Sequence, residues 1–312
     1  MGSTSFLSKK APICPDWLLK KAAGGAAVPM AFVRATSEAV LSSALQAYQA
    51  GLVIPHLVGE RVDIEQIAET HDLSLDGCII HDTQGEKQAI DTAIALAQKG
   101  EVSGFVKGQL HTDIFMGGLV NRDAGMRTDQ RMVHLFAMFP PDGDWPLIIS
   151  DGAVNVTPNE DTRIASSLSI ARLGRAIGIE RPKIAILSAT ESVIASVPSS
   201  GEAERIAAAA RAADDKADFE GPLSLDLAVA PQAAEQKGMT DSAVAGAANG
   251  YVVPDIVSGN ILFKSLVWFG GGCAAGLVMG ARLPIILTSR SDPAEARLAS
   301  IALGAILSQA SS

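Results

Sequence analysis

The chain has 312 residues, of which 48% are hydrophobic and 4% aromatic, and its formal net charge is −9. An acidic chain without a long basic run is not expected to bind nucleic acid, and a chain of this length is expected to fold as two lobes. The scarcity of aromatic residues predicts an interior of Ala, Val, Ile and Leu, which is typical of a parallel sheet covered by Ala-rich helices.

The cysteines are odd in number and widely spaced, at Cys14, Cys78 and Cys273. We therefore expect neither disulfides nor a zinc site. The N-terminal residues carry two lysines, but no sustained apolar segment follows them, so we expect no signal peptide. The most apolar later region, 261–287, is interrupted by charged residues, glycines and a proline, which indicates a buried core and no membrane span. We expect a cytoplasmic protein.

In the first part of the chain, short β-rich runs alternate with longer Ala-rich segments of helical period, which predicts βα units on a mainly parallel sheet. Strands are expected at 28–33, 53–58, 78–81 and 104–106. Helices are expected between them at 37–50, 63–69 and 87–98. Two apolar runs, 132–139 and 147–150, are then joined by a Pro-Pro-Asp-Gly-Asp turn signal. This pattern predicts an antiparallel pair, and hence a mixed sheet.

A second βα series begins with a helix at 159–176 and continues through 183–187, 202–213 and 223–228. Near the C-terminus, the apolar run 283–287 ends at Thr288-Ser289-Arg290, and a helix is expected directly behind it. Ligands of open α/β sheets gather outside the carboxyl ends of strands, and the first amides of a following helix add positive potential there. This strand end is therefore a predicted anion site.

Several segments resemble those of one known family, and they occur in the family's order: GFVKG at 104–108, DGAVN at 151–155, GPLSLD at 221–226, Pro254 with Gly-Asn-Ile at 259–261, and Ser289-Arg290. The chain resembles the phosphate acetyltransferase and phosphate butyryltransferase family, whose members move an acyl group between coenzyme A (CoA) and inorganic phosphate. Each segment alone is a weak signal, but ordered agreement across most of the chain is hard to obtain by chance.

The resemblance implies the two-lobed α/β fold shared with isocitrate and isopropylmalate dehydrogenases, in which mainly parallel mixed sheets carry flanking helices and the last segment returns to the first lobe. We accordingly expect lobe one at 1–145 plus 284–312 and lobe two at 146–283. Ligands commonly bind between domains, so the active site is expected in the interdomain cleft.

The implied reaction is acyl-CoA + phosphate = acyl phosphate + CoA, with acetyl as the expected acyl group. CoA is then a substrate, no cofactor is expected to be tightly bound, no metal is required, and a homodimer is implied. A phosphate butyryltransferase and a non-catalytic CoA or acyl-phosphate binding protein are the alternatives. A dehydrogenase of the related fold is disfavoured, because the sequence shows neither a carboxylate cluster for a divalent metal nor a nucleotide loop.

Three residues near the C-terminus are the expected catalytic residues. By resemblance, Arg290 binds the anionic substrate and Ser289 stabilises the reacting acyl-phosphate group, and a guanidinium suits phosphate because it donates two parallel hydrogen bonds. The family's proton acceptor is an Asp shortly after the Ser-Arg pair, but the spacing here is shorter. Asp292 is our candidate for it. The alternative is a capping box formed by Asp292, Pro293 and Glu295.

Lys107, His111 and Thr112 follow the expected strand at 104–106, and we expect them to bind substrate. The family has an arginine a few residues further on, where this chain has Gly117. Arg127 is our candidate to replace it, because Gly-Met-Arg-Thr at 125–128 resembles a segment of the butyryl branch; a solvated loop arginine is the alternative. His111 is also a possible general base, although a lone His is more often only a hydrogen-bonding residue.

The remaining candidates lie in the middle of the chain. Ser199 and Ser200 precede an expected helix, where they fit either an anion cradle or an ordinary helix start. Asp226, Asn260 and Lys264 match family positions near the cleft, where they are implied to order a loop or contact CoA. Extension of the Lys264 side chain to solvent is the alternative for that residue.

Overall fold

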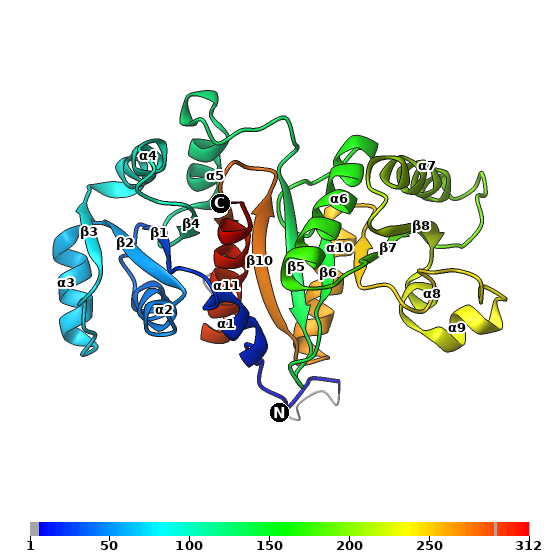
Figure 1. Cartoon of the computed structure of the whole chain (residues 1–312), viewed down its shortest axis with the longest axis horizontal. Coiled ribbons are helices and arrows are strands. Elements are labelled where there is room, and N and C mark those ends of the chain that lie inside the picture. Colours follow the sequence, from blue (N-terminus) through cyan, green and yellow to red (C-terminus); the bar gives the residue numbers. More distant parts are fainter. Residues whose placement is uncertain (1–5, 290–291, 312) are drawn as a thin grey trace. The chain divides into compact units, whose positions relative to one another are not determined.

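The computed structural model describes residues 6–289 and 292–311 and contains two compact units (Figure 1). Unit 1 comprises residues 131–274 and the N-terminal residues up to Pro12, and unit 2 comprises 13–130 and 275–312. These boundaries differ from the expected 145/146 and 283/284, because β5 (Val133–Phe139) pairs antiparallel with β6 (Leu147–Ser150). A boundary after residue 145 separates these two hydrogen-bonded strands.

Unit 2 carries the predicted βα series. Its strands are β1 (Val28–Val33), β2 (Val53–Gly59), β3 (Ile79–Asp82), β4 (Phe105–Lys107), β10 (Cys273–Met279) and β11 (Ile285–Ile286), in the order β3-β2-β1-β4-β11-β10. Neighbouring strands from β3 through β2, β1 and β4 to β11 are parallel, whereas β10 is antiparallel to β11. The predicted strands and their parallel pairing are therefore confirmed, and the predicted mixed sheet is confirmed by the antiparallel pair of β5 and β6.

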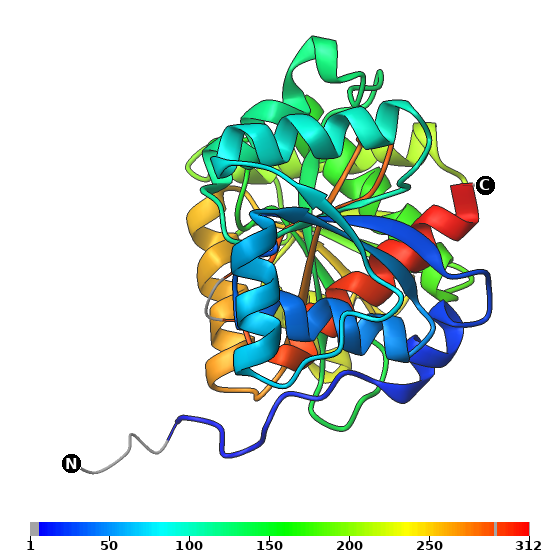
Figure 2. The same cartoon turned by 90° about the vertical axis from the view of Figure 1, so that its left-hand side faces the viewer.

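The helices of unit 2 are α1 (Asp16–Ala22), α2 (Glu38–Gln49), α3 (Arg61–Thr70), α4 (Gly85–Gln98), α5 (Thr112–Val120) and α11 (Ala294–Ser311), with a short 3-10 turn at Arg122–Ala124. Figures 1 and 2 show α4 on one face of the strands and α2 with α11 on the other. Because both faces are covered, β1 is buried along almost its whole length, as its apolar run predicts.

One glycine fixes the end of β4. A Cβ on Gly108 would lie 2.4 Å from the carbonyl oxygen of Val33 and 2.5 Å from that of Arg34, so no side chain fits there. The close approach lets Gly108 and Gln109 donate backbone hydrogen bonds to those two carbonyls. The residues after β4 are thereby held against the residue that follows β1.

Unit 1 contains the second βα series. Its remaining strands are β7 (Lys183–Leu187), β8 (Asp218–Leu223) and β9 (Gly250–Val252), and its strand order is β5-β6-β9-β7-β8 with β6, β9, β7 and β8 parallel. The helices are α6 (Glu160–Ile177), α7 (Pro198–Ala213), α8 (Leu225–Val229), α9 (Pro231–Gln236) and α10 (Ile256–Trp268). The predicted helix at 159–176 is confirmed: Asn159 caps α6 by accepting the N–H of Thr162.

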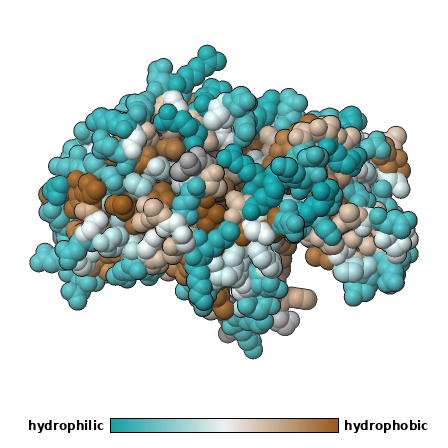
Figure 3. Space-filling model, in the orientation of Figure 1, coloured by the Kyte–Doolittle hydropathy of each residue, from teal (hydrophilic) through white to brown (hydrophobic). Residues whose placement is uncertain are grey.

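One rim of unit 2 has a polar surface (Figure 3). In Figure 3, hydrophilic side chains predominate along the upper rim, where α4 and α5 lie. Within the described part of the chain, no helix combines the length and the apolar character needed to cross a membrane.

Candidate functional site

The carboxyl edge of the unit 2 strands brings several charged residues together. In the register of the sheet, Val33 of β1 pairs with Lys107 of β4, and Val106 pairs with Ile286 of β11. Arg34, Lys107 and Thr288 therefore lie at neighbouring strand ends, although they are far apart in the sequence. This is the edge at which parallel α/β sheets bind ligands.

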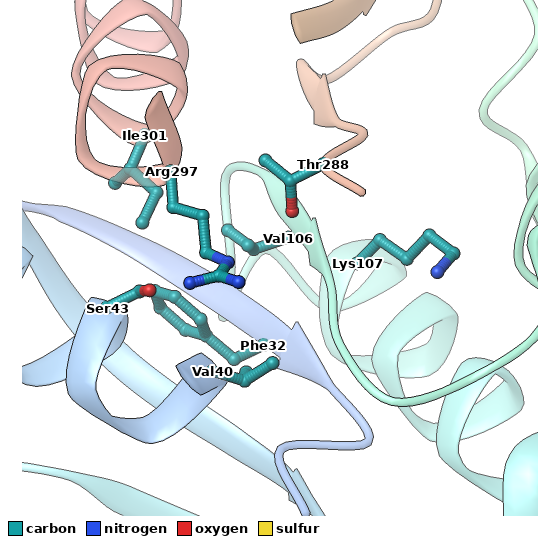
Figure 4. A pocket seen from close by; sticks show the side chains of 8 residues that line it. All are labelled: Phe32, Val40, Ser43, Val106, Lys107, Thr288, Arg297 and Ile301. Carbon is teal, nitrogen blue, oxygen red and sulfur yellow. The ribbon is translucent and has the colours of Figure 1, made fainter. Parts of the chain in front are cut away.

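A small hollow lies beside these strand ends (Figure 4). It is lined by Phe32, Val40, Ser43, Val106, Lys107, Thr288, Arg297 and Ile301. Its volume of about 10 Å³ is room for one water molecule at most. The Arg297 side chain extends from α11 toward Phe32, whereas the amine of Lys107 points away from Arg297. The hollow therefore does not hold a phosphate group, and the amine of Lys107 is directed elsewhere.

Ser289 and Asp292 contact each other at the end of β11. The backbone N–H of Ser289 donates to Oδ2 of Asp292 at 2.7 Å, and the N–H of Asp292 donates to the carbonyl of Ser289 at 3.2 Å. Burial raises the pKa of Asp292, while the hydrogen bond from Ser289 and the charge of Arg297 act in the opposite direction. Arg290 lies outside the described residues. The predicted helix begins at Ala294, directly after Pro293.

His111 lies in a chain of charged contacts. Its Nδ1 is 2.9 and 3.0 Å from the two carboxylate oxygens of Glu86, at the start of α4. Glu86 also accepts a hydrogen bond from Nη1 of Arg34 at 3.3 Å, and Arg34 donates through Nη2 to Glu60 at 3.3 Å. The hydrogen bond from His111 lowers the pKa of Glu86. Thr112 begins α5 and is exposed.

Glu60 and the backbone hold the other side of Arg34. Arg34 has a positive φ of 54° and donates to the carbonyl oxygen of Gln109 at 3.1 Å. Burial acts to raise the pKa of Glu60, but hydrogen bonds from backbone N–H groups and from Arg34 together keep it below its ordinary value. Our sequence reasoning missed Arg34, Glu60 and Glu86. The available signal was their position just after parallel strands or at a helix start.

The structure does not place Arg127 with these residues. Arg127 forms a backbone bridge to Ala281, and the hydroxyl of Thr128 donates to the carbonyl of Gly280 at 2.7 Å. Both partners follow β10, which is antiparallel to β11, so this contact lies at the opposite edge of the sheet. Gly117 is exposed on α5, and a Cβ there would meet nothing within 4 Å. Arg127 thus does not occupy the place of the missing arginine within unit 2.

In unit 1, the serines at the start of α7 are used by the local structure. The buried hydroxyl of Ser200 donates to the carbonyl of Val197 at 2.7 Å and accepts the N–H of Ile194 at 3.0 Å. The hydroxyl of Ser199 is 2.9 Å from that of Ser188. These contacts favour the ordinary helix start over an anion cradle. Asp226 is exposed in the first turn of α8, where a hydrogen bond from Ser224 lowers its pKa.

The loop after β6 is organised by a buried carboxylate. Asp151, 3% exposed, accepts hydrogen bonds from the backbone N–H groups of His134, Ala153 and Val154 and from Nδ2 of Asn155, at 2.7 to 3.0 Å. Our sequence reasoning quoted this segment but gave Asp151 no role. Its position directly after a predicted strand was the available signal.

The start of α10 packs on this loop. Nδ2 of Asn260 donates to the carbonyl of Gly152 at 3.3 Å, and a Cβ on Gly259 would lie 2.4 Å from the carbonyl oxygen of Asp151. Asn260 is thus joined to the loop. Lys264 is exposed further along α10, with its Nζ 6.0 Å from the centre of the Phe263 ring. Among the described residues, no group of three or more His, Cys, Asp or Glu side chains is arranged to hold a metal ion.

Comparisons with known proteins agree on one family. The family described as "Phosphate acetyl/butaryl transferase" matches residues 86–305. A phosphate acetyltransferase of Rickettsia felis is 36% identical over 93% of this chain and 83% of its own length. A phosphate butyryltransferase of Clostridium beijerinckii is 32% identical over 88% of this chain and 90% of its own length.

Solved structures agree with the sequence relatives. A branched-chain phosphotransacylase from Enterococcus faecalis is similar with a TM-score of 0.78 and 25% identity, covering 90% of this chain and 98% of its own. A 4-hydroxythreonine-4-phosphate dehydrogenase from Burkholderia phymatum is similar in fold alone, with a TM-score of 0.55 and 14% identity over 91% of this chain and 99% of its own.

Proposed function

Because the chain belongs to the phosphate acetyl/butyryl transferase family and is an acyltransferase that exchanges an acyl group between CoA and phosphate, we propose that it transfers acetyl and that residues at the carboxyl edge of unit 2 perform the reaction. The observation that carries the proposal is the contact between Ser289 and Asp292 at the end of β11. It brings a half-buried carboxylate next to Ser289, to which the family resemblance assigns a catalytic role.

In the direction that consumes acyl phosphate, the thiol of CoA attacks the acyl carbonyl. A free thiol titrates near pH 8.5, so a proton acceptor is needed to produce thiolate at neutral pH. Asp292 suits this role because burial raises its pKa toward the working range. Ser289 and Arg290 stabilise the oxyanion that forms on the carbonyl oxygen. Lys107, His111 and Thr112 bind the phosphate group from the neighbouring strand end.

The CoA side of the proposal rests on unit 1. Asn260 orders the loop that Asp151 organises, and Asp226 lies exposed after β8, where it is available to a CoA hydroxyl or amide. Ser199 and Ser200 support the start of α7. Lys264 is available to an anionic group of CoA.

We further propose the two-lobed fold of isocitrate and isopropylmalate dehydrogenases, a cytoplasmic location, no tightly bound cofactor, and a homodimer. The likeness to a dehydrogenase structure supports the fold.

Support for a homodimer comes from α10, all of whose residues are described. Gly259 alone is buried in this helix, while Val257, Ile261 and Trp268 are each more than 60% exposed. A second copy of this chain is the occupant we propose for this apolar face, because the family resemblance implies a homodimer and Lys264 is the one charged residue of α10.

The test is turnover of acetyl, propionyl and butyryl phosphate with CoA, followed by thioester absorbance in the presence of a chelator. Acetyl phosphate should give the highest kcat/KM. A preference for butyryl phosphate supports the butyryltransferase alternative. Absence of turnover with all three, together with CoA binding in calorimetry, supports a non-catalytic binding protein.

A further inference from the structure

The proposed reaction needs two proton transfers, and Asp292 supplies only one. When a dianionic acyl phosphate loses its acyl group, the departing phosphate becomes a trianion unless a proton reaches the oxygen that leaves. A phosphate trianion is a poor leaving group, so a general acid at the phosphate side lowers the barrier. The described residues at the carboxyl edge of unit 2 contain a group suited to this task.

Glu86 holds the His111 ring through one nitrogen. Both carboxylate oxygens face Nδ1, at 2.9 and 3.0 Å, which fixes the ring orientation and favours a proton on Nδ1. The His111 side chain is 68% exposed, so the opposite nitrogen, Nε2, lies on the solvent side. Glu86 itself is only 16% exposed, which limits its movement.

Arg34 fixes Glu86 in turn. Its guanidinium is shared between Glu86, Glu60 and the carbonyl of Gln109, so it supports the two carboxylates and is not directed at a substrate. Among the described residues, the charged groups near His111 include Glu86 from α4, with Arg34 and Glu60 behind it, and Asp113 follows two positions later in the first turn of α5. Arg34 forms ion pairs with both Glu60 and Glu86.

We propose that His111 is the general acid for the leaving phosphate and that Glu86 is its positioning residue. The inference rests on the proposed function. The sequence suggested substrate binding, or a general base, for His111; the inference gives it the role of a general acid toward the leaving phosphate.

The phosphate leaves together with a proton from His111. The thiolate sulfur forms a bond to the acyl carbon, and the carbonyl π electrons move to oxygen. When the carbonyl forms again, the bond from carbon to the phosphate oxygen breaks, and its electron pair stays on that oxygen as the proton of Nε2 moves to it. The products are the thioester, monohydrogen phosphate and a neutral imidazole, which solvent protonates again. In the opposite direction, the neutral imidazole takes the proton from monohydrogen phosphate as it attacks.

The experiment compares two histidine–carboxylate pairs on unit 2. His111→Gln should lower kcat for acetyl phosphate and CoA by about a hundredfold or more, the effect of losing a general acid, with a much smaller change in KM. Glu86→Gln should lower kcat less. The matched control is His71, whose Nδ1 is 3.8 Å from Glu38; His71→Gln and Glu38→Gln should keep the wild-type kcat.

A second measurement distinguishes the loss of the general acid from a change in the shape of the site. Added imidazole should partly restore kcat in His111→Ala, because it replaces the lost acid. The proposal is overturned if His111→Gln keeps kcat within about threefold, an effect too small for a lost general acid, or if only KM rises. It is also overturned if three results occur together: His111→Gln has a low kcat, added imidazole does not restore kcat in His111→Ala, and Glu86→Gln has the wild-type kcat. Thermal melts confirm that each variant is folded. An inactive wild-type enzyme contradicts the proposed function itself, and so is a distinguishable result.

Discussion

The backbone N–H of Ser289 donates to the side chain of Asp292 at 2.7 Å, so an oxygen acceptor three positions later helps to hold the catalytic serine candidate. A carboxylate that accepts a backbone hydrogen bond and is nevertheless buried enough to have a raised pKa is held in a fixed place and ready to take a proton. These are the two properties that a general base requires.

Asp292→Asn should lower kcat by about a hundredfold or more while leaving the thermal stability at neutral pH unchanged or higher. Asn keeps an oxygen acceptor for Ser289, and it removes a charge whose burial is unfavourable. Because the pKa of Asp292 is raised, the ionised form is less favoured in the folded chain than in the unfolded chain. Stability contributed by Asp292 therefore falls as pH rises from its unfolded toward its folded pKa. A pH profile of kcat should show an acidic limb above the ordinary carboxylate range, which Asp292→Asn should lack.

Lys107→Met should lower kcat/KM for acetyl phosphate by roughly one to two decades, because a charge-assisted contact contributes about 1.5 to 3 kcal/mol. Arg127→Ala should stay near wild type, since Arg127 lies at the other edge of the strands. Initial rates over a range of acetyl phosphate concentrations decide both. A tenfold rise of KM in Arg127→Ala contradicts the structural placement and supports the sequence-based expectation.

Asp151→Ala should destabilise unit 1 by about 3 kcal/mol or more, because it leaves several buried donors without an acceptor. The control is the exposed Asp241→Ala, which should change the free energy of unfolding by less than about 0.5 kcal/mol. Urea unfolding curves measure both. Equal stability of the two variants means that the loop does not depend on this carboxylate.

Gly117 and Gly118 are adjacent in α5 and should respond oppositely to alanine. Gly117→Ala should stabilise the chain by roughly 0.5 to 1 kcal/mol, because its Cβ meets open space and glycine is unfavourable inside a helix. Gly118→Ala should destabilise it, because a Cβ there lies 2.7 Å from Cγ1 of Ile90 in α4. Thermal melts compare them, and a shift of the same sign for both contradicts the packing of α4 on α5.

Ile261→Arg should turn the proposed homodimer into a monomer, because a charge enters the middle of the exposed apolar face of α10. Val62→Arg is the control: Val62 is 73% exposed on α3 of unit 2, and its substitution should leave the mass unchanged. Light scattering on the eluted protein gives the mass. A wild-type chain that is monomeric at micromolar concentration removes the dimer proposal.

Hydrophobic period and turn signals predicted many of the helices and strands of this chain, although the segment 223–228 mostly forms α8 and contributes only its first residue to β8. The strands at 28–33 and 53–58 and the helix at 159–176 agree with β1, β2 and α6 to within about one residue. Each has a strong local pattern: the two strands are short and mostly apolar, and the helix has an Asn cap at its start and a glycine directly after its end. The antiparallel pair was predictable from its turn sequence.

Contacts between distant residues were not predictable in this way. Arg34 bonds to Glu60 and Glu86, which are 26 and 52 residues away, and these partners meet only because β1 lies next to β2 and α4 starts nearby. The position of Arg127 was not predictable either. Its local sequence resembles a known segment, but the edge at which it lies depends on the direction of β10, which no local pattern encodes.

Gly259 packs closely on Asp151, and this contact joins the first turn of α10 to the loop after β6 as one rigid segment. The N–H of Ile256 also donates to the carbonyl of Val156, so the loop is fastened to the helix at both of its ends. A force applied to the exposed face of α10 is therefore transmitted to the loop without passing through the sheet. Any molecule that binds α10 tightly also restricts the motion of the segment that Asp151 organises.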